Sequence, residues 1–100
     1  MFHVILHRSG PEYRPELPLE QQTRWDEHAA FMDARVADGF LVLGGPLFDE
    51  HRVVYAVHAA TEEDVRETLS RDPWSGTHLR VASIDPWTIR LDGRAVPART

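Results

Sequence analysis

Three features that are common in proteins are missing from this sequence. It contains no cysteine, so disulfide bonds and thiolate metal sites are excluded. It also contains no lysine, because all 11 basic residues are arginines, and this excludes catalysis through a lysine Schiff base. No apolar run approaches the ~20 residues that a membrane-spanning helix needs, and the N-terminus lacks the cleavage pattern of a signal peptide. We therefore predict a cytoplasmic protein that does not interact with membranes.

Positive charge is scarce as well. Sixteen acidic residues against 11 arginines give a formal net charge of −5. This argues against nucleic-acid binding, which depends on a basic surface. A chain of 100 residues is long enough for one domain with one hydrophobic core. We predict a single domain over residues 1–92 and a C-terminal tail over residues 93–100.

Apolar periodicity predicts three elements in the first half of the chain. Phe2–His7 alternates between apolar and polar side chains, which is typical of a strand with one buried face. From Leu19 to Ala37, apolar residues recur at spacings of three and four, which predicts a helix. The short apolar run Phe40–Leu43 predicts a buried strand. We expect Gly44-Gly45-Pro46 to end this strand in a tight turn.

The second half of the chain repeats this pattern. Val53–Val57 predicts a strand that pairs with the preceding one as a hairpin. Thr61, followed by three acidic residues, predicts the N-cap of a second helix, and Asp72-Pro73 ends it. His78–Leu91 alternates again, and Pro86 within it requires a bulge or an edge position in the sheet.

The resulting order is β-α-β-β-α-β. It predicts an α+β fold of the ferredoxin-like type, with a four-stranded antiparallel sheet and both helices on one face. The opposite face would carry Ile5 and other apolar side chains toward water. Because such a face usually binds a partner, we predict a homodimer through the sheet faces.

The first helix places a histidine, His28, on its apolar stripe. A histidine in this position is often a buried side chain satisfied by one hydrogen bond. It becomes a useful general base when a carboxylate fixes one ring nitrogen and leaves the other free. Asp72 is the candidate partner, although it also has a structural explanation as the N-cap of a turn that starts at Pro73.

The remaining histidines do not suggest a metal site. His3 and His7 lie about 13 Å apart along a strand, too far to share an ion. His51, His58 and His78 lack a ligand spacing. We predict no metal and no cofactor.

Several segments together resemble the YCII-related (YciI-like) family. The resemblance covers Phe2 to about Asp92, and its most specific part is the ordered set of a helix histidine, a Gly-Gly-Pro strand exit and an Asp-Pro pair. The segments that carry it are Trp25–Met32, Asp38–Leu47, Arg71–Trp74 and Val81–Trp87.

The resemblance implies a dimeric α+β barrel of ferredoxin-like subunits, with His28 and Asp72 as catalytic residues in a pocket. One branch of the family eliminates chloride from chlorinated hydroxyhydroquinones, and the fold is similar to that of muconolactone isomerases. Some members add a serine, but the residues four and five positions before His28 are Arg24 and Thr23, so the resemblance does not identify a third catalytic residue here. We predict that Gly45, Pro46 and Trp74 bind the ligand.

Three interpretations of the pair remain open. His28 could act as the base of a cofactor-independent lyase or isomerase on a small cyclic oxygenated substrate. The same pocket could belong to a non-catalytic small-molecule binding module. The pair could also be purely structural, in which case no cavity would lie within ~4 Å of the outer nitrogen of His28. Turnover separates the first two, and the geometry of the pocket tests the third.

Overall fold

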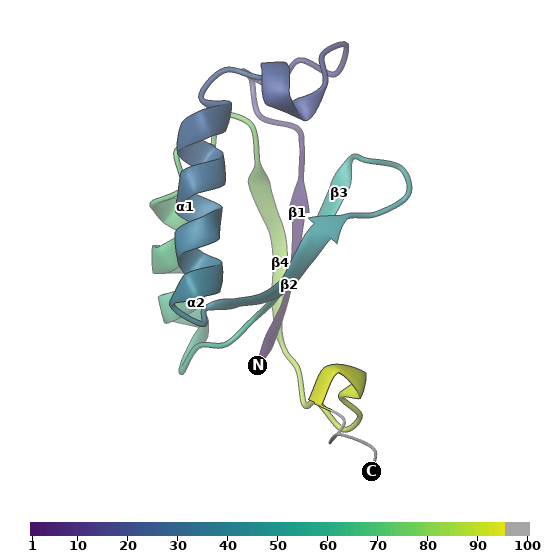
Figure 1. The fold of residues 1–100 in the computed structure, drawn as a ribbon, viewed down its shortest axis with the longest axis vertical. Coiled ribbons are helices and arrows are strands. Elements are labelled where there is room, and N and C mark those ends of the chain that lie inside the picture. The colour runs from purple at the N-terminus through teal and green to yellow at the C-terminus, as the bar shows by residue number, and fades with distance from the viewer. Residues whose placement is uncertain (96–100) are drawn as a thin grey trace.

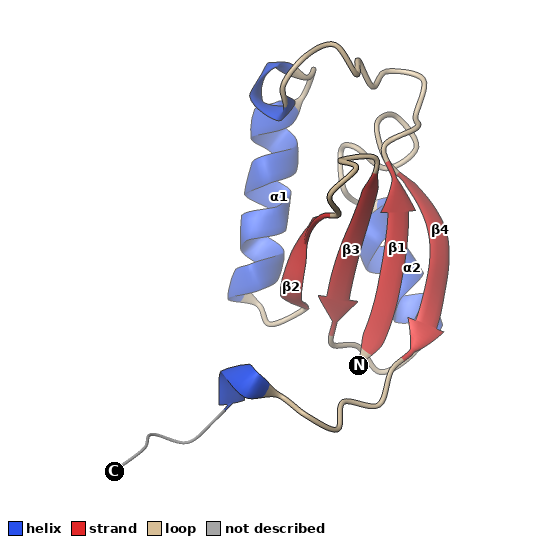
Figure 2. Ribbon diagram, turned by 90° about the vertical axis from the view of Figure 1, so that its right-hand side faces the viewer, coloured by secondary structure: helices blue, strands red, loops and turns tan. Residues whose placement is uncertain are grey.

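A computed structural model describes residues 1–95 of the chain, and its centre is a four-stranded antiparallel sheet in the order β2-β3-β1-β4. Two helices lie on the same side of this sheet (Figure 1), and Figure 2 looks onto the opposite, uncovered face. The arrangement is consistent with a ferredoxin-like fold. The elements, including two short 3-10 turns, are β1 (Phe2–His7), η1 (Leu19–Gln21), α1 (Trp25–Ala37), β2 (Leu41–Pro46), β3 (Arg52–Val57), α2 (Glu62–Ser70), β4 (Arg80–Pro86) and η2 (Gly93–Ala95).

The helix-covered face holds the core. Alternation along β1 sends one set of side chains under the helices, as the sequence predicted. β3 contributes its own alternate residues, and α2 contributes Val65 and Leu69. The core residues of the two central strands are Phe2, Val4, Leu6, Val53, Tyr55 and Val57.

The predicted first helix is shorter than expected. Leu19–Gln21 forms only a 3-10 turn, and α1 begins at Trp25 because Arg24 adopts a left-handed conformation (φ 61°). Buried Gln22 explains the interruption. Its amide donates to the carbonyl oxygens of Arg14 and Leu17 at 2.6 and 3.0 Å, which ties the preceding loop together. The predicted apolar stripe, which includes Trp25, His28, Ala29, Met32 and Val36, is wrong at its C-terminal end, since Val36 is 58% exposed.

The prediction that Gly44-Gly45-Pro46 ends a strand is wrong. These residues continue β2 and pair with Tyr55, Val54 and Val53 of β3. β2 is an edge strand, so proline can lie in it with its missing N–H directed away from the ladder. The chain turns after β2, where Glu50 has a positive φ of 64°.

β4 is an edge strand, which confirms the edge position expected for Pro86, but it ends there, so Trp87–Leu91 does not continue it. Its register with β1 shifts between Ile5 and Leu6, which is a bulge. The bulge reverses the alternation, so Leu79 and Ile84 both reach the core although five positions separate them. Of the predicted tail, residues 93–95 form η2, and residues 96–100 lie outside the described part of the chain.

The second helix follows its prediction closely. Thr61 Oγ1 accepts a hydrogen bond from the Asp64 N–H at 3.1 Å, so Thr61 is the N-cap. Within residues 1–95, neither this helix nor the first is long and apolar enough to span a bilayer.

Candidate active site

The fold brings His28 and Asp72 into contact. His28 lies in the second turn of α1, and Asp72 lies in the turn that follows α2. The Nδ1 atom of His28 is 2.8 Å from Asp72 Oδ1 and 2.9 Å from Oδ2. Asp72 Oδ1 also accepts the Trp74 N–H at 2.9 Å, which is the capping role that its position before proline predicted. Asp72 therefore performs both roles, structural cap and histidine partner.

This contact fixes the tautomer of the His28 ring. An ionised carboxylate only accepts hydrogen bonds, so Nδ1 must carry the hydrogen that points to Asp72. In the neutral ring, Nε2 then has the lone pair. His28 is only 8% exposed. Its Nε2 atom nevertheless forms no hydrogen bond with any residue from 1 to 95. His28 is thus arranged to accept a proton from a neighbour at Nε2.

A pocket of about 240 Å³ opens beside His28. Its walls come from η1, α1, the edge strand β2, the central strand β3 and Arg8, which follows β1. Gly45 and Pro46, the predicted ligand-binding residues, line it, and so does Gly44. A Cβ at Gly44 would come within 2.9 Å of Tyr55 Cδ1, so only glycine fits there without displacing that ring. The lining residues are Arg8, Leu19, Trp25, His28, Met32, Leu41, Gly44, Gly45, Pro46, Val53 and Tyr55.

Another hollow, of about 300 Å³, is larger but lies elsewhere. It is formed by Leu43 and the segment between Trp87 and Arg94, and it contains neither His28 nor Asp72. The pocket beside His28 is the smaller of these two, but its lining includes a histidine whose Nδ1 is held by a carboxylate.

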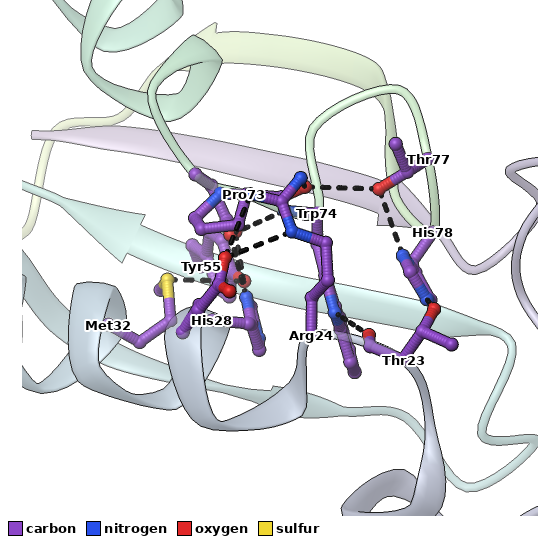
Figure 3. Close-up of polar contacts among 11 residues, drawn as sticks. Thr23, Arg24, His28, Met32, Tyr55, Pro73, Trp74, Thr77 and His78 are labelled. Atoms are coloured by element: carbon purple, nitrogen blue, oxygen red, sulfur yellow. Dashed lines mark hydrogen bonds and ion pairs between the residues drawn. The ribbon is translucent and has the colours of Figure 1, made fainter.

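Trp74 lies behind His28 and not in the pocket. Its ring is 1% exposed and stacks on the His28 ring, with the centroids 4.0 Å apart and the planes 3° from parallel. The indole Nε1–H donates to the Thr23 carbonyl at 2.9 Å (Figure 3). The predicted contact of Trp74 with the ligand is therefore not available in this pocket, and Trp74 instead holds the orientation of the His28 ring.

A second histidine stacks on the other side of Trp74. The ring centroids of His78 and Trp74 are 4.6 Å apart. Both His78 nitrogens are bonded, Nδ1 to Thr77 Oγ1 at 2.9 Å and Nε2 to Thr23 Oγ1 at 3.0 Å (Figure 3). Burial lowers the pKa of His78 below its usual value, with nearby Arg24 acting in the same direction.

Those threonine contacts also bear on the search for a third catalytic residue. The Thr23 hydroxyl is directed to His78 and not to His28. The Arg24 side chain pairs with Glu27 at 2.8 Å, and its Nη1 reaches the Pro73 carbonyl at 3.4 Å. Neither of the two residues that precede α1 joins the His28–Asp72 pair.

Two polar pocket residues were not identified from the sequence. Tyr55 is 4% exposed, and the one acceptor of its hydroxyl among residues 1–95 is a weak one, the Met32 sulfur at 3.9 Å. Burial, reinforced by the negative charge of Asp72, raises the pKa of Tyr55, so the phenol stays protonated and can donate a hydrogen bond. Tyr55 occupies an inward position of the predicted strand Val53–Val57. This position was the one feature of the sequence that could have identified it.

The other residue is Arg8, whose side chain is 6% exposed and lines the pocket. It follows Phe2, Val4 and Leu6 at the next even position of the alternation. The alternation that directs Phe2, Val4 and Leu6 inward therefore also directs the next even-numbered side chain, the charged Arg8, inward.

No family model matches this chain, and a search of curated proteins gives no match either. Among residues 1–95, no three histidine, aspartate or glutamate side chains are grouped closely enough to hold a metal ion. The candidate site therefore rests on its geometry.

Proposed function

We propose that His28 and Asp72 form the catalytic pair of a cofactor-independent lyase or isomerase that acts on a small cyclic oxygenated substrate. One observation carries the proposal. Asp72 holds His28 Nδ1 at 2.8 Å, and Nε2 has no hydrogen-bond partner in the described chain. His28 also lines a pocket of about 240 Å³. A base with this arrangement typically contributes ~10²–10⁴-fold to a rate.

The proposed reaction begins with proton transfer. The lone pair of His28 Nε2 removes a proton from a saturated carbon next to a carbonyl group, and the electrons of that C–H bond enter the substrate as an enolate. In an elimination, those electrons form a double bond and a leaving group such as chloride departs with its bonding pair. In an isomerisation, the imidazolium returns the proton to another carbon. Asp72 stabilises the imidazolium in both cases.

Tyr55 supports the same reaction. Negative charge develops on a substrate oxygen when the proton leaves carbon, and a neutral donor aimed at that oxygen lowers the barrier. Tyr55 lines the pocket, and within residues 1–95 the sole acceptor of its hydroxyl is the Met32 sulfur. Its raised pKa keeps the proton available for donation.

A screen for turnover tests the proposal. Hydroxylated and halogenated aromatics and lactones are incubated with the protein, and products are followed by mass spectrometry in parallel with His28→Gln. The proposal expects an activity that His28→Gln loses. If His28→Gln keeps the activity, the catalytic assignment is wrong. If ligands raise the melting temperature but no compound is converted, the result favours the alternative, a non-catalytic binding module.

The same proposal includes membership of the YCII-related family and a homodimer of the dimeric α+β barrel type. The fold and the His28–Asp72 contact support the family. On the uncovered sheet face, Ile5 and Val54 lie opposite each other and are only partly buried, and Leu43 is 56% exposed. Such an apolar face favours association of two sheets. Sedimentation at micromolar concentration is expected to give a dimer, and a monomer would contradict this part of the proposal.

A further inference from the structure

Arg8 is a buried cation on the wall of the candidate active site. It follows the last residue of β1, and its side chain is only 6% exposed. It lines the same pocket as His28 and Tyr55. It is close enough to Tyr55 for its positive charge to oppose the burial-driven rise in the pKa of that phenol. The pocket therefore holds a positive charge beside the base and the phenol.

Most of the hydrogen-bonding capacity of this guanidinium is unused. Its Nη1 donates to the Glu50 carbonyl at 2.8 Å and to Glu50 Oε1 at 3.2 Å. Its Nε is enclosed and has no acceptor, and Nη2 has none among residues 1–95. A buried donor without an acceptor is costly and is rare in folded proteins. Nη2 is thus the guanidinium nitrogen, outside the enclosed Nε, that has donors to offer and no acceptor in residues 1–95.

The charge of Arg8 is also incompletely neutralised. Glu50 is the carboxylate paired with it, but its side chain is 67% exposed, and solvent weakens such a pair. The carboxylate nearest His28, that of Asp72, is already bound to His28 and to the Trp74 N–H. Arg35 Nε is buried and also lacks a hydrogen bond, but it lies 2.9 Å from Asp38 Oδ2 and so is paired in charge. Among residues 1–95, the Nε of Arg8 has no such carboxylate.

We propose that Arg8 binds a carboxylate group of the ligand that occupies this pocket. A planar carboxylate matches the fork of a guanidinium and can accept two parallel hydrogen bonds from it. The pocket, at about 240 Å³, lies just below the ~300–1,000 Å³ range of ordinary ligand pockets, so the ligand is a small acid. Within the proposed function, on which this inference rests, the substrate is a small cyclic oxygenated carboxylic acid.

The test measures binding without requiring turnover. Benzoate, furan-2-carboxylate and crotonate are titrated into the protein, each beside its neutral amide, with binding followed by NMR shifts of the His28 and Trp25 rings. We expect saturable binding of at least one acid and at least tenfold weaker binding of its amide. Failure of all three acids to bind would overturn the inference, as would equal binding of acid and amide.

Variants then assign the binding to Arg8. Arg8→Met keeps an apolar stem of similar length and is expected to weaken acid binding about 10- to 100-fold, as the loss of charged hydrogen bonds implies. Arg8→Lys keeps the charge but lacks the guanidinium fork, so its affinity for the acids should lie between those of the wild type and Arg8→Met. Arg66→Gln, which removes an exposed charge on α2, is the matched control and should bind like the wild type. Burial of an incompletely paired charge costs stability, so removal of that charge in Arg8→Met should not prevent folding. If Arg8→Met does not fold, Arg8→Lys is compared with the wild type instead.

The outcomes also separate this inference from the proposed function. His28→Gln should still bind the acids, so binding without any turnover would contradict the catalytic proposal and leave Arg8 as an anion-binding residue. Acid binding that is unchanged in both Arg8 variants would overturn the inference even if turnover is found. Inorganic phosphate is titrated as well, and phosphate binding tighter than that of every carboxylate would overturn the assignment to a carboxylate.

Discussion

The two histidines that flank Trp74 have the same side chain but opposite surroundings. His28 stacks on one face of the indole and His78 on the other. His28 has one bonded nitrogen, its partner is a carboxylate, and it lines a pocket. His78 has two bonded nitrogens, its partners are threonine hydroxyls, and its exposed fraction is 0%. One ring is arranged for proton transfer and the other is sealed into the structure.

The comparison shows that burial alone does not distinguish the histidine that we propose as the base. Both rings are buried and both stack on the same tryptophan. They differ in the charge of the hydrogen-bond partner and in whether the second nitrogen is occupied. A carboxylate stabilises the imidazolium that forms when the base takes a proton, whereas hydroxyls in an enclosed site favour the neutral ring.

The largest expected effect is on the rate of the proposed reaction. His28→Gln should lower kcat by about 10²–10⁴-fold because it removes the proton acceptor. His78→Gln should leave kcat largely unchanged and instead lower the free energy of unfolding by about 1–3 kcal/mol, through loss of its buried hydrogen bonds. Steady-state kinetics and urea unfolding of both variants measure the two effects. A comparable loss of kcat in both variants would remove the distinction between the histidines.

The next effect concerns the ring that both histidines contact. Trp74→Ala is expected to lower the free energy of unfolding by about 3–5 kcal/mol, because a fully buried indole leaves a cavity. Trp87→Ala is the matched control. That ring is 45% exposed and meets His3 edge-on, so its loss should cost much less. Urea unfolding compares them, and equal costs would show that Trp74 is not the central contact of this region.

The smallest effect is a pH dependence that belongs to His78. Burial lowers its pKa in the folded protein, so the unfolded chain binds a proton that the folded chain does not. The associated stability is fully present above the unfolded pKa of ~6.5 and is lost as the pH falls below that value. Among the groups that act on His78, Glu12 and Asp72 raise the pKa, and His28 and Arg24 lower it.

The measurement compares urea unfolding of the wild type and His78→Gln between pH 7.5 and 5.5. The wild type should lose stability more steeply, by at most about 1.4 kcal/mol per pH unit, since a single proton is involved. Parallel slopes would mean that the His78 pKa is not lowered.

Much of this architecture could be predicted from local patterns. Alternation in β1 and the capping threonine of α2 depend on neighbouring residues, and both are confirmed. The early start predicted for α1 was wrong because the contacts that interrupt it, from Gln22 back to Arg14 and Leu17, are made by a side chain. Proline in β2 was misread because edge position is a property of the whole sheet.

The site divides in the same way. Asp72 could be paired with His28 only through a family resemblance, since 44 positions separate them and no local pattern joins them. Arg8 and Tyr55 escaped prediction because a charged or phenolic side chain at an inward strand position is normally read as a continuation of the strand. Their chemical significance depends on the pocket, which β2, β3, α1 and the residues Arg8 and Leu19 form together.

The way the loop before α1 is anchored has a consequence for the evolution of ligand preference. Gln22 closes the segment from Arg14, and the backbone of Glu12 donates to the Thr77 carbonyl at 2.8 Å, so both ends of the loop are anchored. Its tip, at Pro15 and Glu16, is exposed. Insertions at this tip would alter the surroundings of Leu19 at the edge of the pocket without shifting α1. Ligand preference could therefore diversify by loop length alone, while the position of the base is inherited unchanged.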